Sequence, residues 1–376
     1  MRTCSKVLAF LILFSVVTAA QKDSAADAIL LEREGKLAES ADAWRIFIRQ
    51  HANDASAYAS LGVVLSKQQR YAEAVNAYKK ALQLNPKLPG IRMNLGLAEF
   101  KQGHFRAAIA PLNTALANDA GNMQARTLLG MSYYGDKQFG NAAKHLQVAA
   151  ASDPDNPELQ HLLAQSCLWA GQYQCAVDGF RQLLRVQPDS AAMHILVGEA
   201  LDGLGKTPEA IAEFEEAARV SPREPNVHFG LGFLYWKSHE YEKAKLAFET
   251  ELRNDPDNAQ ALAYLGDTEM ELGNREQATS LLTKAVALKS DIRIAHIDLG
   301  VLLLQDKRYK EAVSEFQKAI KLDPKQPDAH YRLAHAYQGL GQTAEADKEF
   351  QLVQQLHAER DTKLTPKMSS APPALQ

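Results

Sequence analysis

The chain has 376 residues and a formal net charge of −3, with 46% hydrophobic and 7% aromatic residues. This balance gives it no basic field that would attract nucleic acid, so a nucleic-acid-binding protein is disfavoured. Length alone would allow two or three domains.

The first twenty residues have the features of a secretory signal peptide. Arg2 and Lys6 give a basic start, residues 7–17 are apolar, and residues 18–20 (Thr-Ala-Ala) are small enough for cleavage. The apolar run is shorter than the ~20 residues that a membrane span needs. We therefore predict removal of residues 1–20, which takes the net charge from −3 to −5 through loss of the two basic residues. The mature protein would be periplasmic or secreted; an uncleaved interfacial anchor is the alternative.

A 34-residue period dominates the rest of the chain. An apolar residue followed by glycine or alanine recurs nine times without an insertion, at Leu61, Leu95, Leu129, Leu163, Val197, Leu231, Leu265, Leu299 and Leu333. Thirteen positions after each of them stands an alanine, from Ala74 to Ala346. A period of this length predicts an array of stacked units in which each unit contacts only its neighbours.

The unit at residues 55–88 predicts a pair of helices. Apolar and small residues recur at helical spacing within residues 58–65 and again within residues 74–81. Pro86 then ends the second helix, because proline cannot continue a helix and disfavours helical geometry just before itself. Each unit is therefore predicted to be a helical hairpin.

Small residues mark the place where the two helices of a hairpin meet. Gly62 in the first helix and Ala74 in the second are predicted to lie where the backbones approach closely. Glycine costs about 1 kcal/mol against alanine inside a helix. It therefore needs a packing reason of this kind.

This pattern of Leu-Gly, alanine, a large second-helix residue and a closing proline resembles the tetratricopeptide repeat. The matching units are 55–88, 89–122, 123–156, 157–190, 191–224, 225–258, 259–292, 293–326 and 327–360. The resemblance implies an all-α fold, an α-solenoid in which helix-turn-helix repeats form a right-handed superhelix with the first helices on the concave side. Together with the signal peptide, the chain resembles exported bacterial members of the family.

Both ends of the array depart from the pattern. Residues 21–54 keep Trp44 in register but have Asp27 where the leucine should stand, which indicates a degenerate N-terminal capping repeat whose outer face meets water. Residues 361–376 lose the period and are rich in proline, serine and alanine, so we predict a flexible C-terminal tail.

Cysteine is scarce in the predicted mature chain. Cys4 lies within the signal peptide, which leaves Cys167 and Cys175 in the two helices of one hairpin. Export permits a disulfide between them. Two small core thiols are the other interpretation.

The resemblance also places a binding groove on the first helices, at positions five, nine and twelve of each unit. We call the residues at these positions the groove stripe. Its predicted peptide-binding members are Met93, Leu97, Phe100, Met131, Tyr134, Phe229, Phe233 and Trp236. Polar residues such as Asp267 interrupt it. None of the nine units has the lysine or asparagine that carboxylate-clamping relatives use at positions five and nine, which disfavours a clamp for chain termini.

Histidines at one repeated position form a candidate metal site. They are His194, His228, His296 and His330. Zinc ligands must converge on one ion at about 2 Å, whereas equivalent sites in stacked repeats are a hairpin apart. We therefore predict packing or hydrogen-bonding histidines, and no metal or cofactor. In residues 153–156 and 255–258, Asp and Asn are predicted to cap the next helix.

No nucleophile, base and orienting group recur together, and no segment is left over for a catalytic domain. The sequence therefore favours a non-enzymatic scaffold that binds protein or peptide segments in the cell envelope. The alternative is an accessory subunit that recruits substrate to a separate envelope enzyme or to secretion or polysaccharide-export machinery.

Overall fold

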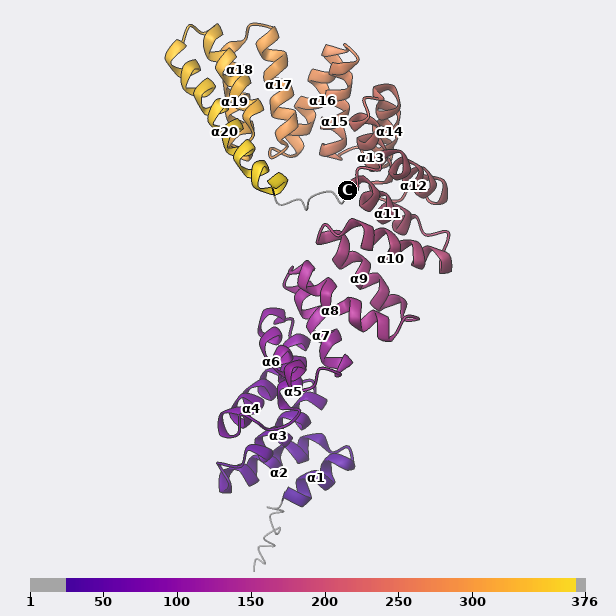
Figure 1. Cartoon of the computed structure of the whole chain (residues 1–376), viewed down its shortest axis with the longest axis vertical. Helices are drawn as coiled ribbons and strands as arrows, with labels where there is room; N and C mark the ends of the chain where they lie inside the picture. The colour runs from indigo at the N-terminus through magenta and orange to yellow at the C-terminus, as the bar shows by residue number, and fades with distance from the viewer. Residues whose placement is uncertain (1–24, 370–376) are drawn as a thin grey trace, which may run out of the picture. The chain divides into compact units, whose positions relative to one another are not determined.

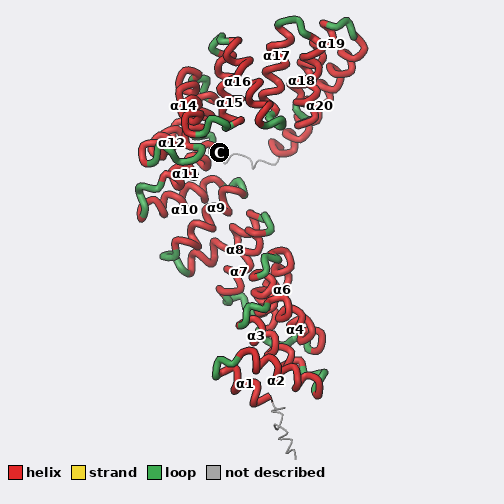
Figure 2. The backbone as a smooth tube through the Cα atoms, turned by 180° about the vertical axis from the view of Figure 1, so that it is seen from behind, coloured by secondary structure: helices red, strands yellow, loops and turns green. Residues whose placement is uncertain are grey.

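The computed structural model describes residues 25–369, with side chains as far as Glu359. Every regular element in this range is an α-helix, and successive helices fold back on one another as hairpins (Figure 1, Figure 2). None of the helices described there is both long and apolar enough to cross a bilayer. The predicted signal peptide, residues 1–20, lies outside the described residues.

The chain divides into two compact units, Met1–Ala170 and Gly171–Gln376. The first contains α1 (Ala25–Arg33), α2 (Leu37–Gln50), α3 (Ala55–Lys67), α4 (Tyr71–Leu84), α5 (Ile91–Lys101), α6 (Phe105–Asn118), α7 (Met123–Gly135), α8 (Phe139–Ser152) and α9 (Pro157–Trp169). The second contains α10 (Tyr173–Val186), α11 (Ala191–Gly203), α12 (Thr207–Val220), α13 (Val227–Lys237), α14 (Tyr241–Asn254), α15 (Ala259–Glu271), α16 (Arg275–Leu288), α17 (Arg293–Gln305), α18 (Tyr309–Leu322), α19 (Pro327–Gly339) and α20 (Thr343–Ser369). The 34-residue period passes through this division without a break, so the sequence pattern does not mark it.

Each predicted repeat contains one odd-numbered and one even-numbered helix, here called its first and second helix. The capping unit 21–54 contains α1 and α2, where Ser40 replaces the usual alanine and donates a 2.8 Å hydrogen bond to the carbonyl oxygen of Ala28. At the other end α20 continues to Ser369, past residue 361, from which the sequence predicts a flexible tail. Residues 343–364 contain no glycine or proline, and the first proline within α20 is Pro366, near its end.

In seven of the nine repeats, a contact between a glycine and a large side chain holds the hairpin together, whereas Ala164 and Ala334 replace the glycine in the other two. A Cβ atom added at Gly62 would lie 2.4 Å from the Tyr78 ring, and one added at Gly198 would lie 2.6 Å from the Phe214 ring. The predicted close approach is therefore present, but the atoms nearest to the glycine belong to the side chain at position 24 of the same repeat, here Tyr78 or Phe214. The backbone comes next, with the carbonyl oxygen of Ala210 3.3 Å from the Gly198 position.

Neighbouring repeats within one of the two compact units are joined by a second contact between an aromatic ring and a glycine. An aromatic residue that opens a second helix packs against a glycine in the first helix of the following repeat, as Phe105 does against Gly135 and Tyr309 against Gly339. First helices also touch directly, at α3–α5, α5–α7, α13–α15, α15–α17 and α17–α19. The first helices therefore form one face over α3, α5 and α7 in the first unit and another over α13, α15, α17 and α19 in the second.

The turn between the two helices of every repeat needs a left-handed residue. In ten repeats the same position has a positive φ, at Gly35, Gln69, Gly103, Lys137, Gly171, Gly205, His239, Gly273, Lys307 and Gly341. The turn thus recurs even where glycine is absent. Junctions between repeats behave as predicted, because Asn156 and Asn258 each accept a hydrogen bond from a backbone N–H three residues on, at 3.1 Å.

The repeated histidines tie the first helix to the second helix and to the preceding turn. His296 Nδ1 lies 2.7 Å from a Glu315 carboxylate oxygen, and its Nε2 lies 3.0 Å from the Ser290 carbonyl oxygen. His194 and His330 make the same pair of bonds in their own repeats. The hydrogen-bonding interpretation is confirmed. In the described part of the chain, no three His, Cys, Asp or Glu side chains are placed to hold a metal ion.

The pKa of His296 is raised above its ordinary value. The hydrogen bond to Glu315 is the main cause, and burial of the ring opposes it. Both imidazole nitrogens face acceptors, so the protonated ring satisfies both bonds by donating from each nitrogen. The ring position thus favours the charged form.

We predict that Gly300→Ala destabilises the array by about 1–3 kcal/mol, because the new Cβ would lie 2.5 Å from the Phe316 ring. Gly140→Ala is the matched control, since nothing lies within 4 Å of its added Cβ and alanine favours the helix by up to about 1 kcal/mol. Urea unfolding followed by circular dichroism checks both variants. Equal unfolding midpoints for the two would contradict the assigned contact.

Glu315→Gln is expected to destabilise the chain by about 1–3 kcal/mol near pH 6, because it removes a charge-assisted bond to His296. A histidine with a raised pKa stabilises the fold fully below its unfolded pKa of about 6.5 and loses that contribution as pH rises through the folded value. The difference in melting temperature from the unsubstituted chain should therefore narrow by about pH 9. Glu311→Gln, which breaks an exposed pair with Arg308, is the control and should show no such narrowing.

Candidate functional site

The eight predicted binding residues of the groove stripe lie on the first helices α5, α7 and α13. All eight are half-buried, neither fully in the core nor fully in solvent. One part of each side chain therefore packs against the protein, and another part remains accessible to solvent. This is the geometry expected of an apolar surface that is held rigidly and remains accessible.

In the first unit, Met93 and Phe100 pack against a buried group around Leu112 and Leu129. The Phe100 ring meets Phe105 edge to face at 5.5 Å between centroids. A hollow of about 270 Å³ in α3–α5 has Leu97 in its lining. Core residues therefore hold the buried sides of Met93 and Phe100 in place.

Further along the same unit, Met131 lines a hollow of about 370 Å³ at α7 and α9. Tyr134 donates a 2.6 Å hydrogen bond to the side-chain oxygen of Gln165. Both members of that bond are groove-stripe residues of neighbouring repeats. The polar stripe position at Gln165 therefore supports its aromatic neighbour.

In the second unit the stripe forms an aromatic cluster, which we define as Phe229, Phe233, Trp236 and Tyr264. Phe233 stacks on Trp236 at 5.7 Å and meets Tyr264 edge to face at 5.4 Å between centroids. Phe229 lies 5.9 Å from the fully buried Phe248 ring and anchors the cluster in the core. Sequence reasoning found three of these rings and missed Tyr264, which stands at position six, next to the stripe.

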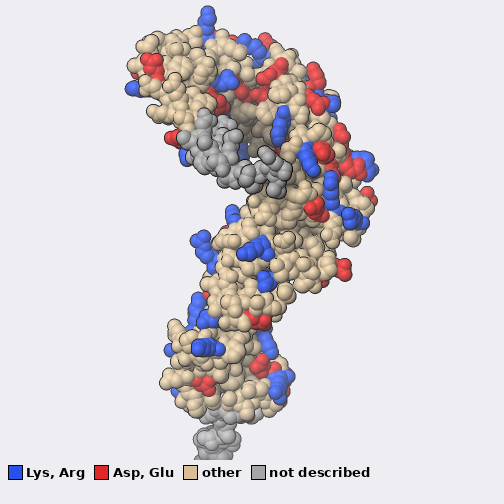
Figure 3. All heavy atoms as spheres, in the orientation of Figure 1, with Lys and Arg blue, Asp and Glu red and all other residues tan. Residues whose placement is uncertain are grey.

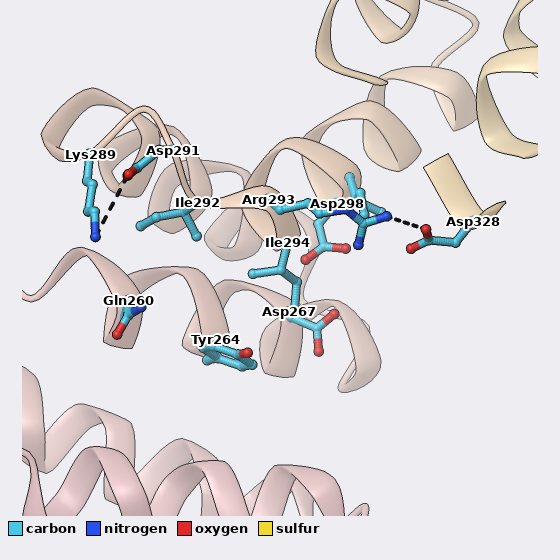
Figure 4. A pocket seen from close by; sticks show the side chains of 11 residues that line it. Gln260, Tyr264, Asp267, Lys289, Asp291, Ile292, Arg293, Ile294, Asp298 and Asp328 are labelled. Atoms are coloured by element: carbon cyan, nitrogen blue, oxygen red, sulfur yellow. Dashed lines mark hydrogen bonds and ion pairs between the residues drawn. The ribbon is translucent and has the colours of Figure 1, made fainter. Parts of the chain in front are cut away.

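Beside the aromatic cluster is a polar pocket of about 490 Å³ on α15 and α17 (Figure 4). We call it the aspartate pocket. Its lining includes Gln260, Tyr264, Asp267, Lys289, Asp291, Ile292, Arg293, Ile294, Ile297, Asp298 and Asp328. Trp236 Nε1 donates a hydrogen bond to the Asp267 carboxylate and so joins the pocket to the aromatic cluster.

Two carboxyl groups in the pocket have raised pKa values. Burial is the main cause for both, and the negative charge of Asp267 raises the pKa of Asp298 further. Asp298 is only 6% exposed. A strongly perturbed carboxyl in a pocket is a recognised sign of a functional site.

The sequence predicts Asp267 only as a polar interruption of the groove stripe, and Asp298 is not among the predicted site residues. The signal that would have found it is local. Asp298 is the only acidic residue in the first-helix run Ile294–Leu304, which is otherwise mostly apolar. Its proximity to Asp267 depends on how two neighbouring first helices pack, and one sequence does not show that.

Surface charge is mixed. On the face shown in Figure 3, basic and acidic side chains both occur on each unit. This agrees with the small net charge of the whole chain.

The two candidate disulfide residues are both oxidised in the structure. Cys167 lies in α9 and Cys175 in α10, and each is disulfide-bonded. This state agrees with the disulfide interpretation rather than with two free core thiols. The pairing of Cys167 with Cys175 stays a prediction.

Comparison with known proteins finds similar repeats. The chain is 32% identical over 81 residues to mouse DnaJ homolog subfamily C member 3, which is 22% of this chain and 16% of that protein. The matched part of this chain therefore spans less than a fifth of that relative's length.

Several solved repeat structures are also similar. One, titled a TPR protein with an unusual peptide-binding site, is YrrB, at 22% identity, 50% of this chain, 97% of that chain and a TM-score of 0.39. MamA from Desulfovibrio magneticus RS-1 matches at 22% identity, 46% and 97% coverage and a TM-score of 0.40. The APC/C hetero-tetramer Cut9-Hcn1 matches at 18% identity, 88% and 73% coverage and a TM-score of 0.46.

Family models decide the membership. A model described as TPR repeat matches residues 64–103, 198–238 and 302–341, and models described as tetratricopeptide repeat match residues 93–157, 229–278, 133–200 and 327–358. Together these matches cover well over half of the chain. With the helical hairpins seen at the same period, they show that this chain belongs to the tetratricopeptide repeat family.

Proposed function

We propose that this chain is an exported, non-enzymatic scaffold that binds protein or peptide segments along the face of its first helices. The observation that carries the proposal is the aromatic cluster of α13 and α15. Its rings are fixed from below by Phe248 and yet only half-buried. Large rings held in this way supply apolar contact area at little cost in side-chain entropy, which makes them strong anchors for a partner.

The rest of the groove stripe supports the same function. Met93, Leu97 and Met131 each line a hollow of the first unit, formed by first helices together with adjoining second helices and loops. Methionine adapts its shape to different apolar partners. A face with several such places suits an extended segment or a helix with spaced apolar residues.

The proposed location is the cell envelope. Its support is the N-terminal sequence, with a basic start, a short apolar run and Thr-Ala-Ala at residues 18–20. The oxidised state of Cys167 and Cys175 agrees with an oxidising compartment.

Intact-mass measurement tests export and the disulfide together. Protein recovered from outside the cytoplasm should lack residues 1–20. After reduction its mass should rise by two hydrogen atoms per bond, and peptide mapping should join Cys167 to Cys175. Full-length protein confined to the cytoplasm would contradict the export proposal.

Site-specific crosslinking tests the binding face. A photo-crosslinking phenylalanine analogue in place of Phe233 should capture protein segments in intact producing cells. The matched control places the same analogue at Leu246, an apolar residue of α14 that is 64% exposed. Capture at position 246 equal to that at position 233 would contradict a specific binding face. Identification of an enzyme as the main captured protein would assign the accessory role instead of a general scaffold.

A further inference from the structure

The charges in the lining of the aspartate pocket do not balance. The lining has four aspartates and two basic residues. Lys289 pairs with Asp291, and Arg293 pairs with Asp328 (Figure 4). Asp267 and Asp298 are left without a basic partner in the lining.

Asp298 points to a ligand by a separate observation. Its Oδ2 atom is buried and has no hydrogen-bond partner among the described residues, although the side chain is more than nine-tenths buried and lines the pocket. A buried polar atom without a partner costs stability, and a buried charge costs more. The free chain therefore keeps an acceptor in the pocket that a bound group would satisfy.

Charged residues of both signs face the aspartate pair from the surrounding helices. From α15 the pair faces Glu271, which adds negative charge, and from α19 it faces Arg332, which favours the charged carboxylates. Those two charges oppose one another, and in the described part of the chain Arg332 forms no ion pair with either aspartate. Acidic residues therefore outnumber basic residues in and around the pocket.

Apolar groups lie around the carboxyl pair. The Tyr264 ring and the side chains of Ile294 and Ile297 line the same pocket. Lysine and arginine carry a long aliphatic stem that packs on such surfaces while the charged head reaches a polar partner. The pocket volume of about 490 Å³ lies in the usual range for ligand sites.

We propose that the aspartate pocket binds a lysine or arginine side chain of the partner segment, with the cation between Asp267 and Asp298 and the stem along Tyr264 and Ile297. This inference rests on the proposed function, because it takes the first-helix face as the binding face. Tyr264 belongs to both the pocket and the aromatic cluster, and Trp236 bonds to Asp267. The preferred segment is therefore a basic residue with an aromatic or aliphatic residue near it in sequence.

The test uses labelled nine-residue peptides with capped ends, one central lysine or arginine and apolar flanking residues. Matched peptides carry the uncharged norleucine at the centre. Fluorescence polarisation with the full chain should show the basic peptides binding at least about tenfold more tightly, as expected of a buried charge pair. Asp298→Asn should remove most of this preference, because it removes the buried carboxylate.

Melting temperatures distinguish a variant that has lost binding in the pocket from one that no longer folds. A carboxyl with a raised pKa weakens the folded state once pH exceeds its unfolded pKa of about 3.9, and this cost disappears below that pH. Asp298→Asn should therefore raise the melting temperature at neutral pH, with the gain vanishing in acid. Asp267→Asn is the second variant if Asp298→Asn fails to fold.

Asp257→Asn is the matched control. It removes the same charge from an exposed position in the same unit, where Asp257 pairs with Lys284, and should leave the lysine preference unchanged. Equal binding of lysine and norleucine peptides would overturn the inference, as would an equal loss in Asp257→Asn. If norleucine peptides still bind and Phe233→Ala abolishes that binding, the scaffold function stands and only the basic pocket fails. If neither kind of peptide binds, the basic pocket is likewise rejected, and crosslinking at position 233 decides the scaffold function separately.

Discussion

The packing of a large second-helix side chain against a glycine of the first helix is the contact on which most repeats of this array depend. At Gly62, Gly198 and Gly300 the space of a Cβ is taken by the ring of the facing second helix. Protein interiors are close-packed, so neither member of the contact can change size without moving the helices. This constraint explains why the period has no insertion, because an extra residue would rotate one partner away from the other.

The alanines of the second helix serve the same contact. All nine, from Ala74 to Ala346, are buried, and at Gly198 the backbone of Ala210 comes within 3.3 Å of the added Cβ position. Phe350 is the informative exception among the large residues, since it is only half-buried. It belongs to the last repeat, which has no following repeat to cover it.

The bonds of the histidines and the contacts between first helices determine which side chains remain accessible to a partner. A bond from His296 to Glu315 and another to the Ser290 carbonyl use both nitrogens of that ring, so the His296 side chain ties its two helices and the preceding turn together. First helices that touch one another bury the inner half of the groove stripe and leave the outer half accessible. Rigid support and partial exposure therefore come from the same packing.

The aspartate pocket combines a buried oxygen without a hydrogen-bond partner and a second buried carboxyl group. Most buried polar groups of the array have a partner, whereas Asp298 keeps one oxygen without any beside a second carboxyl. Proteins tolerate such a cost mainly where binding or catalysis recovers it. The pocket and the aromatic cluster adjoin, so a cationic and an apolar contact can be made by one short segment.

The sequence alone determined the helices, the repeat boundaries and the family, because a 34-residue period with Gly62 and Ala74 in fixed register allows few other structures. It also predicted the hydrogen-bonding role of the histidines and the capping role of Asn156, which depend on neighbours a few residues away or on the next helix. Tertiary structure decided the rest. The division at Ala170 and the helix beyond residue 361 have no mark in the period. The pairing of Asp267 with Asp298 joins residues on two neighbouring first helices, and only the packing of those helices brings their carboxyl groups together.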